Sequence, residues 1–152
     1  GPPLLAHTAS FEGTLVAEHI SGKKVKPMDY NNVPSCTYTH PEVASVGLSE
    51  KEALSEGFEL NVGKFPFSAL GKTLAEGDRD GFVKIIYDKK YGELLGCHII
   101  GKNATNLITE VSIARNLEST FTELLNTIHP HPTLSEAIHE ATADAFNEAI
   151  HI

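Results

Sequence analysis

Apolar residues in the second half of the chain alternate with polar ones, as strands with one buried face require. Residues 81–87 (GFVKIIY) follow this alternation, and residues 93–100 (ELLGCHII) form a second, largely apolar run. The polar segment between them, residues 88–92 (DKKYG), ends in glycine and is typical of a hairpin loop. We therefore predict that the two runs form an antiparallel pair of strands.

Three shorter segments are also predicted to be strands, because they contain β-branched and aromatic residues and are bounded by turn-forming residues. They are residues 34–39, 43–47 and 58–65, and a His-Pro pair separates the first from the second. Glycine inside a strand often marks a β-bulge, so we expect a bulge at Gly63.

Helical spacing of apolar residues, together with helix-start signals, predicts five helices elsewhere in the chain. They cover residues 4–20, 49–54, 104–117, 119–125 and 134–149, with a further helical turn near 69–75 inside the loop 68–80. Ser49 and Glu52 have the spacing of a capping box. Asn103 and Ser119 are expected to cap the helices that follow them with their side chains.

These elements together predict an α+β fold in which helices flank an antiparallel sheet. The first helix is set apart by residues 23–32, which begin with lysines, contain Pro27 and end in two asparagines, as a linker would. The predicted organisation is therefore a helical segment over residues 1–22, a linker over 23–32, and the α+β domain over 33–152.

Composition narrows the possible partners. With 152 residues the chain can bury a core without disulfides or metals. Its net charge of -8 argues against nucleic acid as a partner, because only one short basic cluster, residues 23–26, offsets it. No apolar run approaches the roughly 20 residues of a membrane helix, so no membrane partner is expected. Cys36 and Cys97 show no redox or metal spacing, which favours a reducing compartment.

The strongest candidate for chemistry is the segment HPHPTLSEA at residues 129–137. Proline fixes its own φ and favours extended backbone before it, so His131 is expected on a stiff, non-helical spur. A helix that begins at Thr133 places Glu136 in its first turn, close to that spur. Because a carboxylate can orient an imidazole and make it more basic, His131 and Glu136 together indicate a general acid/base.

Other roles for the histidines are weaker. His129, His131 and His139 together suggest a metal site, but their spacing matches no strong zinc pattern, and no metal is predicted. His7 and His40 are interpreted as surface or capping residues. The sequence also contains no G-x-G-x-x-G, no P-loop, no paired redox cysteines and no G-x-S-x-G, and therefore no familiar fingerprint for binding a dinucleotide.

With these residues identified, three segments resemble the pyridine nucleotide-disulfide oxidoreductases, a family of flavoenzymes. Residues 129–137 are similar to the signature of the dihydrolipoamide dehydrogenases in that family. Residues 33–47 (VPSCTYTHPEVASVG) resemble the start of its C-terminal dimerisation domain, and residues 3–7 (PLLAH) resemble the last helix of its FAD domain. The resemblance covers essentially the whole chain and implies a C-terminal fragment, with one helix left from the FAD domain before the dimerisation domain.

The resemblance implies a role for each candidate residue. His131 matches the base and Glu136 the carboxylate that orients it, in an active site completed by the partner subunit. The bond from His131 to Pro132 is expected to be cis. The stretch that touches the flavin is matched by Leu4, Leu5, Ala6 and His7. FAD, the NAD site and the redox-active cysteine pair would lie upstream in the parent protein, so this fragment is expected to retain neither cofactor nor activity.

The implied activity of the parent is oxidation of protein-bound dihydrolipoamide to lipoamide with NAD, through FAD and a redox disulfide. A thiol with a pKa of about 8.5 is mostly protonated at neutral pH, and a buried imidazole could remove that proton so that the thiolate attacks the disulfide. The implied partners are a second copy in a homodimer and the lipoyl-bearing subunits of 2-oxoacid dehydrogenase or glycine cleavage complexes. The expected location is the bacterial cytoplasm, with a mitochondrial or plastid matrix as the alternative.

Two alternatives stay open. The chain by itself can be a non-catalytic dimerisation module, since it lacks the cysteine pair. It can also come from a related reductase: glutathione reductase shares the His-Pro-Thr element but departs from LSEA at residues 134–137, and mercuric reductase ends in a cysteine pair where this chain ends in His151-Ile152. Pro130 departs from the family pattern, where alanine is more usual, and no function follows from it.

Overall fold

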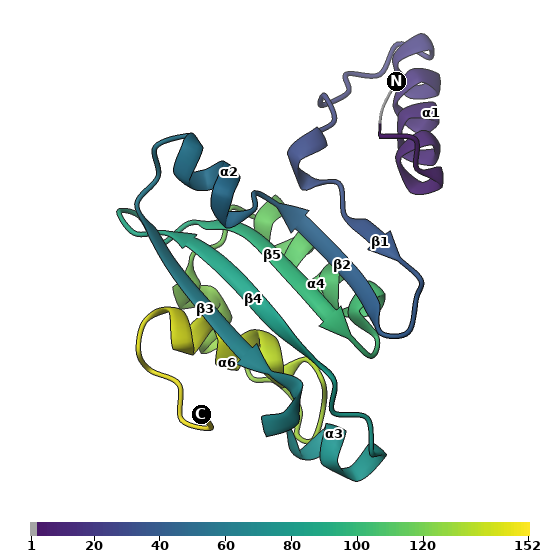
Figure 1. The fold of residues 1–152 in the computed structure, drawn as a ribbon. Helices are drawn as coiled ribbons and strands as arrows, with labels where there is room; N and C mark the ends of the chain where they lie inside the picture. The colour runs from purple at the N-terminus through teal and green to yellow at the C-terminus, as the bar shows by residue number, and fades with distance from the viewer. Residues whose placement is uncertain (1–2) are drawn as a thin grey trace.

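The computed structural model describes residues 3–152, and its centre is an antiparallel sheet of five strands (Figure 1). The strands are β1 (Ser35–Thr37), β2 (Glu42–Gly47), β3 (Leu60–Pro66), β4 (Gly81–Asp88) and β5 (Leu94–Gly101). Their order across the sheet is β1-β2-β5-β4-β3. The predicted strand pair is confirmed as β4 and β5. Gly1 and Pro2, the first residues of the predicted segment 1–22, lie outside the described residues.

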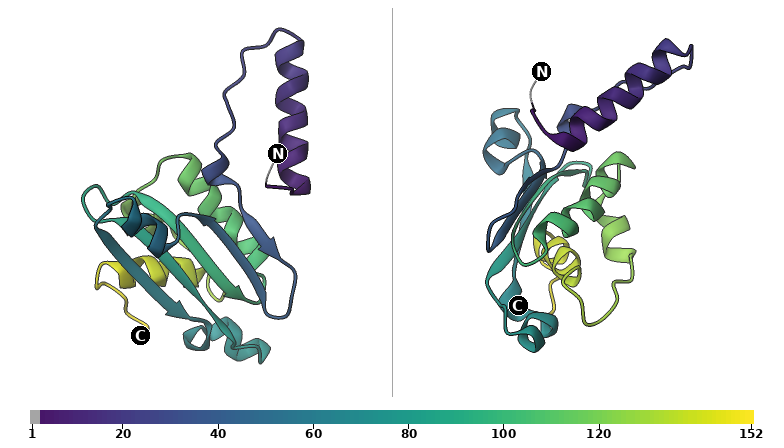
Figure 2. Two further views of the ribbon diagram at one scale, coloured as in Figure 1. Left: turned by 45° about the horizontal axis from the view of Figure 1, so that its top comes forward. Right: turned by 90° about the vertical axis from the view of Figure 1, so that its right-hand side faces the viewer.

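The helices that follow the last strand lie on one face of this sheet (Figure 2). The helices of the chain are α1 (Ala6–Ile20), α2 (Glu50–Ser55), α3 (Gly71–Glu76), α4 (Ala104–Asn116), α5 (Phe121–Asn126) and α6 (Glu136–Ala145), with 3-10 turns at Tyr30–Asn32 and Phe67–Ala69. Helices α4 and α6 pack against the sheet, whereas α1 projects away from it. The predicted α+β class, an antiparallel sheet with helices, is confirmed.

The core lies between the sheet and helices α4 and α6. Its fully buried apolar side chains include Phe65, Ile85, Ile99, Ile108 and Ile138. Burial of each such side chain contributes about 1.5–3 kcal/mol to folding. Tyr87 is buried among them, and its hydroxyl lies 2.9 Å from Thr142 Oγ1, so β4 is tied to α6 by a polar contact as well.

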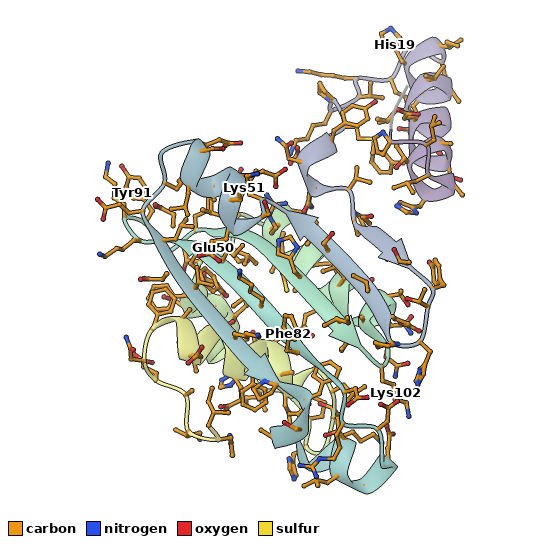
Figure 3. All side chains as sticks on the ribbon, in the orientation of Figure 1. His19, Glu50, Lys51, Phe82, Tyr91 and Lys102 are labelled. Carbon is orange, nitrogen blue, oxygen red and sulfur yellow. The ribbon has the colours of Figure 1, made fainter. Side chains whose placement is uncertain are left out.

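The opposite face of the sheet carries α2 and both polar side chains and a smaller buried apolar cluster of Ala53, Ile86 and Leu95 (Figure 3). On this face Lys84 makes an ion pair with Glu50 at the start of α2, and the Lys64 ammonium lies 4.1 Å from the centre of the Phe82 ring. The larger of the two apolar clusters lies on the face that is covered by α4 and α6, and the candidate chemistry lies on that side.

The expected bulge at Gly63 is wrong. Strand β3 pairs with β4 in continuous register, and the register shift lies between β4 and β5, at Ile86 and Tyr87. Gly63 is needed for a different reason, because a Cβ at this position would lie 1.8 Å from the carbonyl oxygen of Ala141. The absence of a side chain lets α6 approach the sheet closely.

Helix caps follow the predictions only in part. The capping box of Ser49 and Glu52 is present. The cap predicted at Ser119 is wrong, because Thr120 forms a capping box one residue later. Asn103 does precede α4, but its side chain makes no capping bond among the described residues; it adopts a positive φ of 59°. Asn103 therefore contributes through its backbone, because asparagine adopts a positive φ more readily than most residues do.

The last helix is shorter than the predicted 134–149. It begins at Glu136 and ends at Ala145, because Asn147 turns the chain with a φ of 61°. Phe146 then stacks on Phe121 of α5, with 3.8 Å between ring centres. This aromatic contact returns the chain toward the body of the domain.

The segment between α1 and the sheet is fastened to α4. Arg115 donates hydrogen bonds to the carbonyl oxygen of Asn31, at 2.7 Å, and to Asn32 Oδ1, at 3.2 Å. Asn32 in turn donates to the carbonyl oxygen of Ser112. Helix α1 and the residue Leu4 before it expose large apolar side chains, at Leu4, Phe11, Val16 and Ile20.

Candidate active-site histidine and carboxylate

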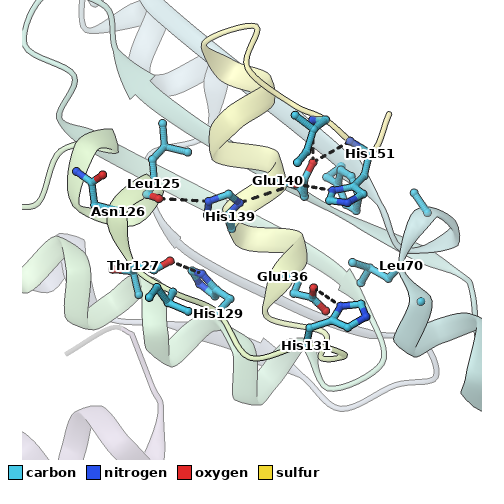
Figure 4. A pocket seen from close by; sticks show the side chains of 15 residues that line it. Leu70, Leu125, Asn126, Thr127, His129, His131, Glu136, His139, Glu140 and His151 are labelled. Carbon is cyan, nitrogen blue, oxygen red and sulfur yellow. Dashed lines mark hydrogen bonds and ion pairs between the residues drawn. The ribbon is translucent and has the colours of Figure 1, made fainter.

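The segment that joins α5 to α6 carries His131 on its outer side. The peptide bond from His131 to Pro132 is cis, as the resemblance implied. The ring of His131 is 74% exposed, and its Nδ1 lies 2.8 Å from Glu136 Oε1 (Figure 4). The structure therefore brings the two predicted residues into direct contact.

Glu136 is held from two sides. It is the first residue of α6, where the helix dipole favours negative charge, and its Oε2 accepts a hydrogen bond of 2.7 Å from the Thr133 backbone N–H. Burial alone raises the pKa of Glu136, but the bonds from Thr133 and His131 outweigh it and leave the pKa below its ordinary value. The carboxylate is therefore ionised at neutral pH.

This contact defines the protonation of a neutral His131 ring. An ionised carboxylate only accepts hydrogen bonds, so Nδ1 must hold the proton and Nε2 keeps its lone pair. Among residues 3–152 no group forms a hydrogen bond with Nε2. A neutral ring in this state can accept a proton on the side that faces solvent. The exposed ring agrees with the prediction that His131 stands on a spur, in a site that this chain alone does not complete.

A hollow of about 350 Å³ opens beside the pair. It is bounded by the end of α5, the loop with His131, one side of α6 and the end of the chain (Figure 4). Glu140 lies in its wall, where its Oε1 is 2.8 Å from His151 Nδ1. The lining of the hollow combines such polar groups with apolar residues, among them Leu70 and Ile150.

His129 has a different environment, which the sequence did not reveal. Its side chain is 7% exposed; Nε2 lies 2.7 Å from Glu110 Oε1, and Nδ1 lies 3.0 Å from the carbonyl oxygen of Thr127. The hydrogen bond with Glu110 raises the pKa of His129, against the opposing effect of burial. Glu110 is 19 residues away in sequence, and no local signal pointed to this pair.

The three histidines that suggested a metal do not converge. The rings of His129 and His139 are 5.5 Å apart, but His131 bonds to Glu136 instead. Across residues 3–152 no three side chains of His, Cys, Asp or Glu form a group that could hold a metal ion.

The residues predicted to touch the flavin lie elsewhere in the chain. Leu4, Leu5, Ala6 and His7 precede or begin α1, and none of them lines the hollow beside His131. His7 Nε2 lies 2.9 Å from the carbonyl oxygen of Pro34, so this ring also contacts the start of the sheet domain. A single chain therefore keeps the two sets of candidate residues apart.

The cysteines form no site. Cys97 is fully buried in the core, and burial raises the pKa of its thiol. Cys36 is partly buried on the edge strand, and the two thiols are free. Within the part of the chain that the structure describes, no helix is both long enough and apolar enough to cross a membrane.

Comparison with known proteins identifies the class. The family model described as "Pyridine nucleotide-disulphide oxidoreductase, dimerisation domain" matches residues 33–142. The chain belongs to this family, and these residues are its dimerisation domain.

Its relatives are more specific. The chain is 48% identical over 152 residues to dihydrolipoyl dehydrogenase (also called dihydrolipoamide dehydrogenase) of Zymomonas mobilis, covering 99% of this chain and 33% of that protein. It is 46% identical over 144 residues to the mitochondrial dihydrolipoyl dehydrogenase of Caenorhabditis elegans, covering 95% and 29%. The chain thus spans about a third of the length of these relatives. The resemblance drawn from the sequence is confirmed.

Solved structures agree with the fold. LpdA from Mycobacterium tuberculosis superposes with a TM-score of 0.88 at 27% identity, over 93% of this chain and 31% of that one. RclA from Escherichia coli, an HOCl-induced flavoprotein disulfide reductase, gives a TM-score of 0.88 at 22% identity, over 94% and 33%. The second similarity supports the fold alone.

Proposed function

We propose that this chain is the C-terminal third of a dihydrolipoyl dehydrogenase subunit. In this proposal residues 1–22 are the last helix of the FAD domain, residues 23–32 are a linker, and residues 33–152 are the interface domain. The parent oxidises protein-bound dihydrolipoamide to lipoamide with NAD, through FAD and a redox cysteine pair that lie outside this chain. The identities of the relatives support this assignment.

The single observation that carries the proposed chemistry is the contact between His131 and Glu136. In the proposed reaction, Nε2 of His131 takes the proton from a thiol of dihydrolipoamide, and the thiolate attacks the disulfide of the partner subunit. Glu136 holds the ring in the tautomer that leaves Nε2 free, and it stabilises the imidazolium once the proton has moved. The high exposure of His131 in one chain supports a site that a second subunit completes.

The start of α1 fits the polar edge of a flavin. The helix has no side-chain cap at Leu5, and the first backbone N–H groups of any helix lack intrahelical partners. The hydroxyl of Thr8 is buried and has no hydrogen-bond partner within residues 3–152, next to a hollow of about 290 Å³. We infer that Leu4, Leu5, Ala6 and His7 hold FAD in the parent. Bound FAD would supply the redox chemistry that this chain lacks.

The proposed partners are a second copy of the subunit and the lipoyl-bearing subunits of 2-oxoacid dehydrogenase or glycine cleavage complexes. A homodimer accounts for apolar side chains that stay exposed on the helical side, at Ile113, Leu117 and Ile128. Relatives occur in bacteria and in mitochondria. We propose the bacterial cytoplasm as the location.

The test is a chimera in which this chain replaces the matching third of the Zymomonas mobilis enzyme. Turnover of dihydrolipoamide, bound FAD and dimer formation are measured for the chimera and for its His131→Gln variant. We expect the variant to keep FAD and the dimer but to lose turnover. Near-normal turnover in the variant would reject His131 as the base.

A second function, of a different class, is dimerisation without catalysis by the 152-residue chain alone. The exposed apolar side chains on its helical side favour this role. Light scattering on the isolated chain measures its mass directly. A monomer at all concentrations would show that the missing domains supply an essential part of the interface.

A further inference from the structure

The loop before α6 contains a second histidine that the proposed chemistry does not use. His129 lies between α4 and α6, with its ring 5.5 Å from that of His139 and its Nε2 against Glu110 of α4. With 7% of its side chain exposed, the imidazole is buried where few polar groups are tolerated without partners. Both ring nitrogens have a partner, so the residue is fixed in position and rotation.

The two partners determine the charge of this ring. The carbonyl oxygen of Thr127 can only accept a hydrogen bond, so Nδ1 of His129 must donate to it. The ionised carboxylate of Glu110 can also only accept, so Nε2 must donate as well. A histidine that donates from both nitrogens is an imidazolium, and this pair is therefore a hydrogen-bonded ion pair. Such charge-assisted bonds are among the stronger polar contacts in proteins.

This ion pair connects the catalytic loop to a helix that does not flank it. Among the described residues, residues 128–132 make one side-chain hydrogen bond to an element other than α5 and α6, and it is the bond from His129 to Glu110. After His131 the chain is held by Thr133, whose hydroxyl donates to the carbonyl oxygen of Pro130. The ring of His131 is therefore carried by residues 129–133, which we call the arch. This segment is fixed on one side by Glu110 and on the other by Glu136.

We propose that Glu110 and His129 are positioning residues for the reaction, an inference that rests on the proposed function. They fix the arch from α4, so that the His131 ring meets Glu136 through Nδ1 and presents Nε2 to the substrate. Because the ring is otherwise exposed, its direction depends on the backbone that carries it. Small errors in the placement of a catalytic group lower the rate strongly.

The first test uses the same chimera with Glu110→Ala and Glu110→Gln introduced separately. Alanine removes the acceptor of the Nε2 proton of His129, whereas glutamine keeps an oxygen there and removes only the charge. We expect Glu110→Ala to lower kcat about 10- to 100-fold with the KM for dihydrolipoamide nearly unchanged, and Glu110→Gln to restore most of the loss. Equal kcat values in all three proteins would overturn the proposal.

The second test needs no activity and uses the 152-residue chain. Proton–nitrogen NMR correlations of the imidazole side chains show which ring nitrogen of His131 holds the proton at pH 8. We expect Nδ1 in the unaltered chain and a mixture of both tautomers in Glu110→Ala. An unchanged tautomer in the folded variant would contradict the positioning role. Glu110→Asp, which shortens the reach of the carboxylate, replaces the alanine variant where the latter does not fold.

Glu56→Ala changes an exposed carboxylate at the end of α2, on the other face of the sheet, and should leave kcat and the His131 tautomer unchanged. If His131→Gln keeps turnover, the proposed function fails whatever Glu110 does. If His131→Gln loses turnover while Glu110→Ala changes neither kcat nor tautomer, only the positioning role fails.

Discussion

Two imidazoles that are two residues apart, His129 and His131, are used in opposite ways. His129 is buried, donates from both nitrogens and is paired with a carboxylate from a distant helix. His131 is exposed, donates from one nitrogen to a carboxylate five residues away and leaves the other free. The chemical groups are the same, and the surroundings decide whether the ring stabilises the fold or is available to a substrate.

A buried, fully hydrogen-bonded histidine can hold the backbone that carries an exposed, reactive one. Burial and full hydrogen bonding remove a histidine from chemistry, because both of its nitrogens are occupied. Exposure with a single orienting carboxylate leaves a histidine competent as a base. The proline-containing arch between the two lets one ring fix the backbone while its neighbour faces solvent.

The largest expected contrast is between activity and stability in His131→Gln. In the chimera, turnover should fall about 10²- to 10⁴-fold, the usual contribution of a general base. The free energy of unfolding of the 152-residue chain should change by no more than about 0.5 kcal/mol, because the ring is exposed. Kinetic assays and urea unfolding measure the two effects. A large loss of stability would show that His131 also has a structural role.

The larger loss of stability is expected for His129→Ala. Removing one partner of a buried ion pair costs about 3–5 kcal/mol, but Glu110 keeps 37% of its side chain exposed, so the loss should be nearer 1–3 kcal/mol. Urea unfolding of the 152-residue chain measures it, with His19→Ala on the exposed side of α1 as the matched control. A change as small as that of the control would mean that the ion pair contributes little.

The pH dependence of stability should show whether the His129 ring that pairs with Glu110 is charged in the folded chain. The pKa of His129 is raised in the folded chain, so its contribution is fully present below its ordinary value of 6.5 and is lost as the pH rises through the raised value. The stability difference between the unaltered chain and His129→Gln should therefore shrink as the pH rises above 6.5. Urea unfolding at pH 6, 7, 8 and 9 tests this; a constant difference would argue against a charged ring.

The smallest effect is expected for Glu136→Gln. In the unaltered chain the pKa of the Glu136 carboxyl is lowered by folding. The contribution of Glu136 to stability is therefore present above the ordinary pKa of 4.5 and is lost as the pH falls through the lowered pKa. In the chimera, turnover should fall less than in His131→Gln, because glutamine still accepts a hydrogen bond from Nδ1. The ratio of the two kcat values measures this. A loss equal to that of His131→Gln would give the carboxylate charge a larger part in the reaction.

The sequence by itself determined the features that depend on neighbours along the chain. The hairpin of β4 and β5, the capping box at Ser49 and the closeness of His131 to Glu136 all arise within a few residues, where backbone preference and local hydrogen bonds dominate. The residues of the signature segment also sufficed to identify the family.

Only the tertiary structure decided the contacts between distant segments. The approach of α6 to Gly63 and the pairing of His129 with Glu110 both depend on how helices pack on the sheet. The same holds for the hollow beside His131, whose lining residues come from segments far apart in the chain. Local sequence preferences act only between near neighbours, whereas packing brings together residues far apart in the chain, and it therefore gave His129 its structural role through Glu110.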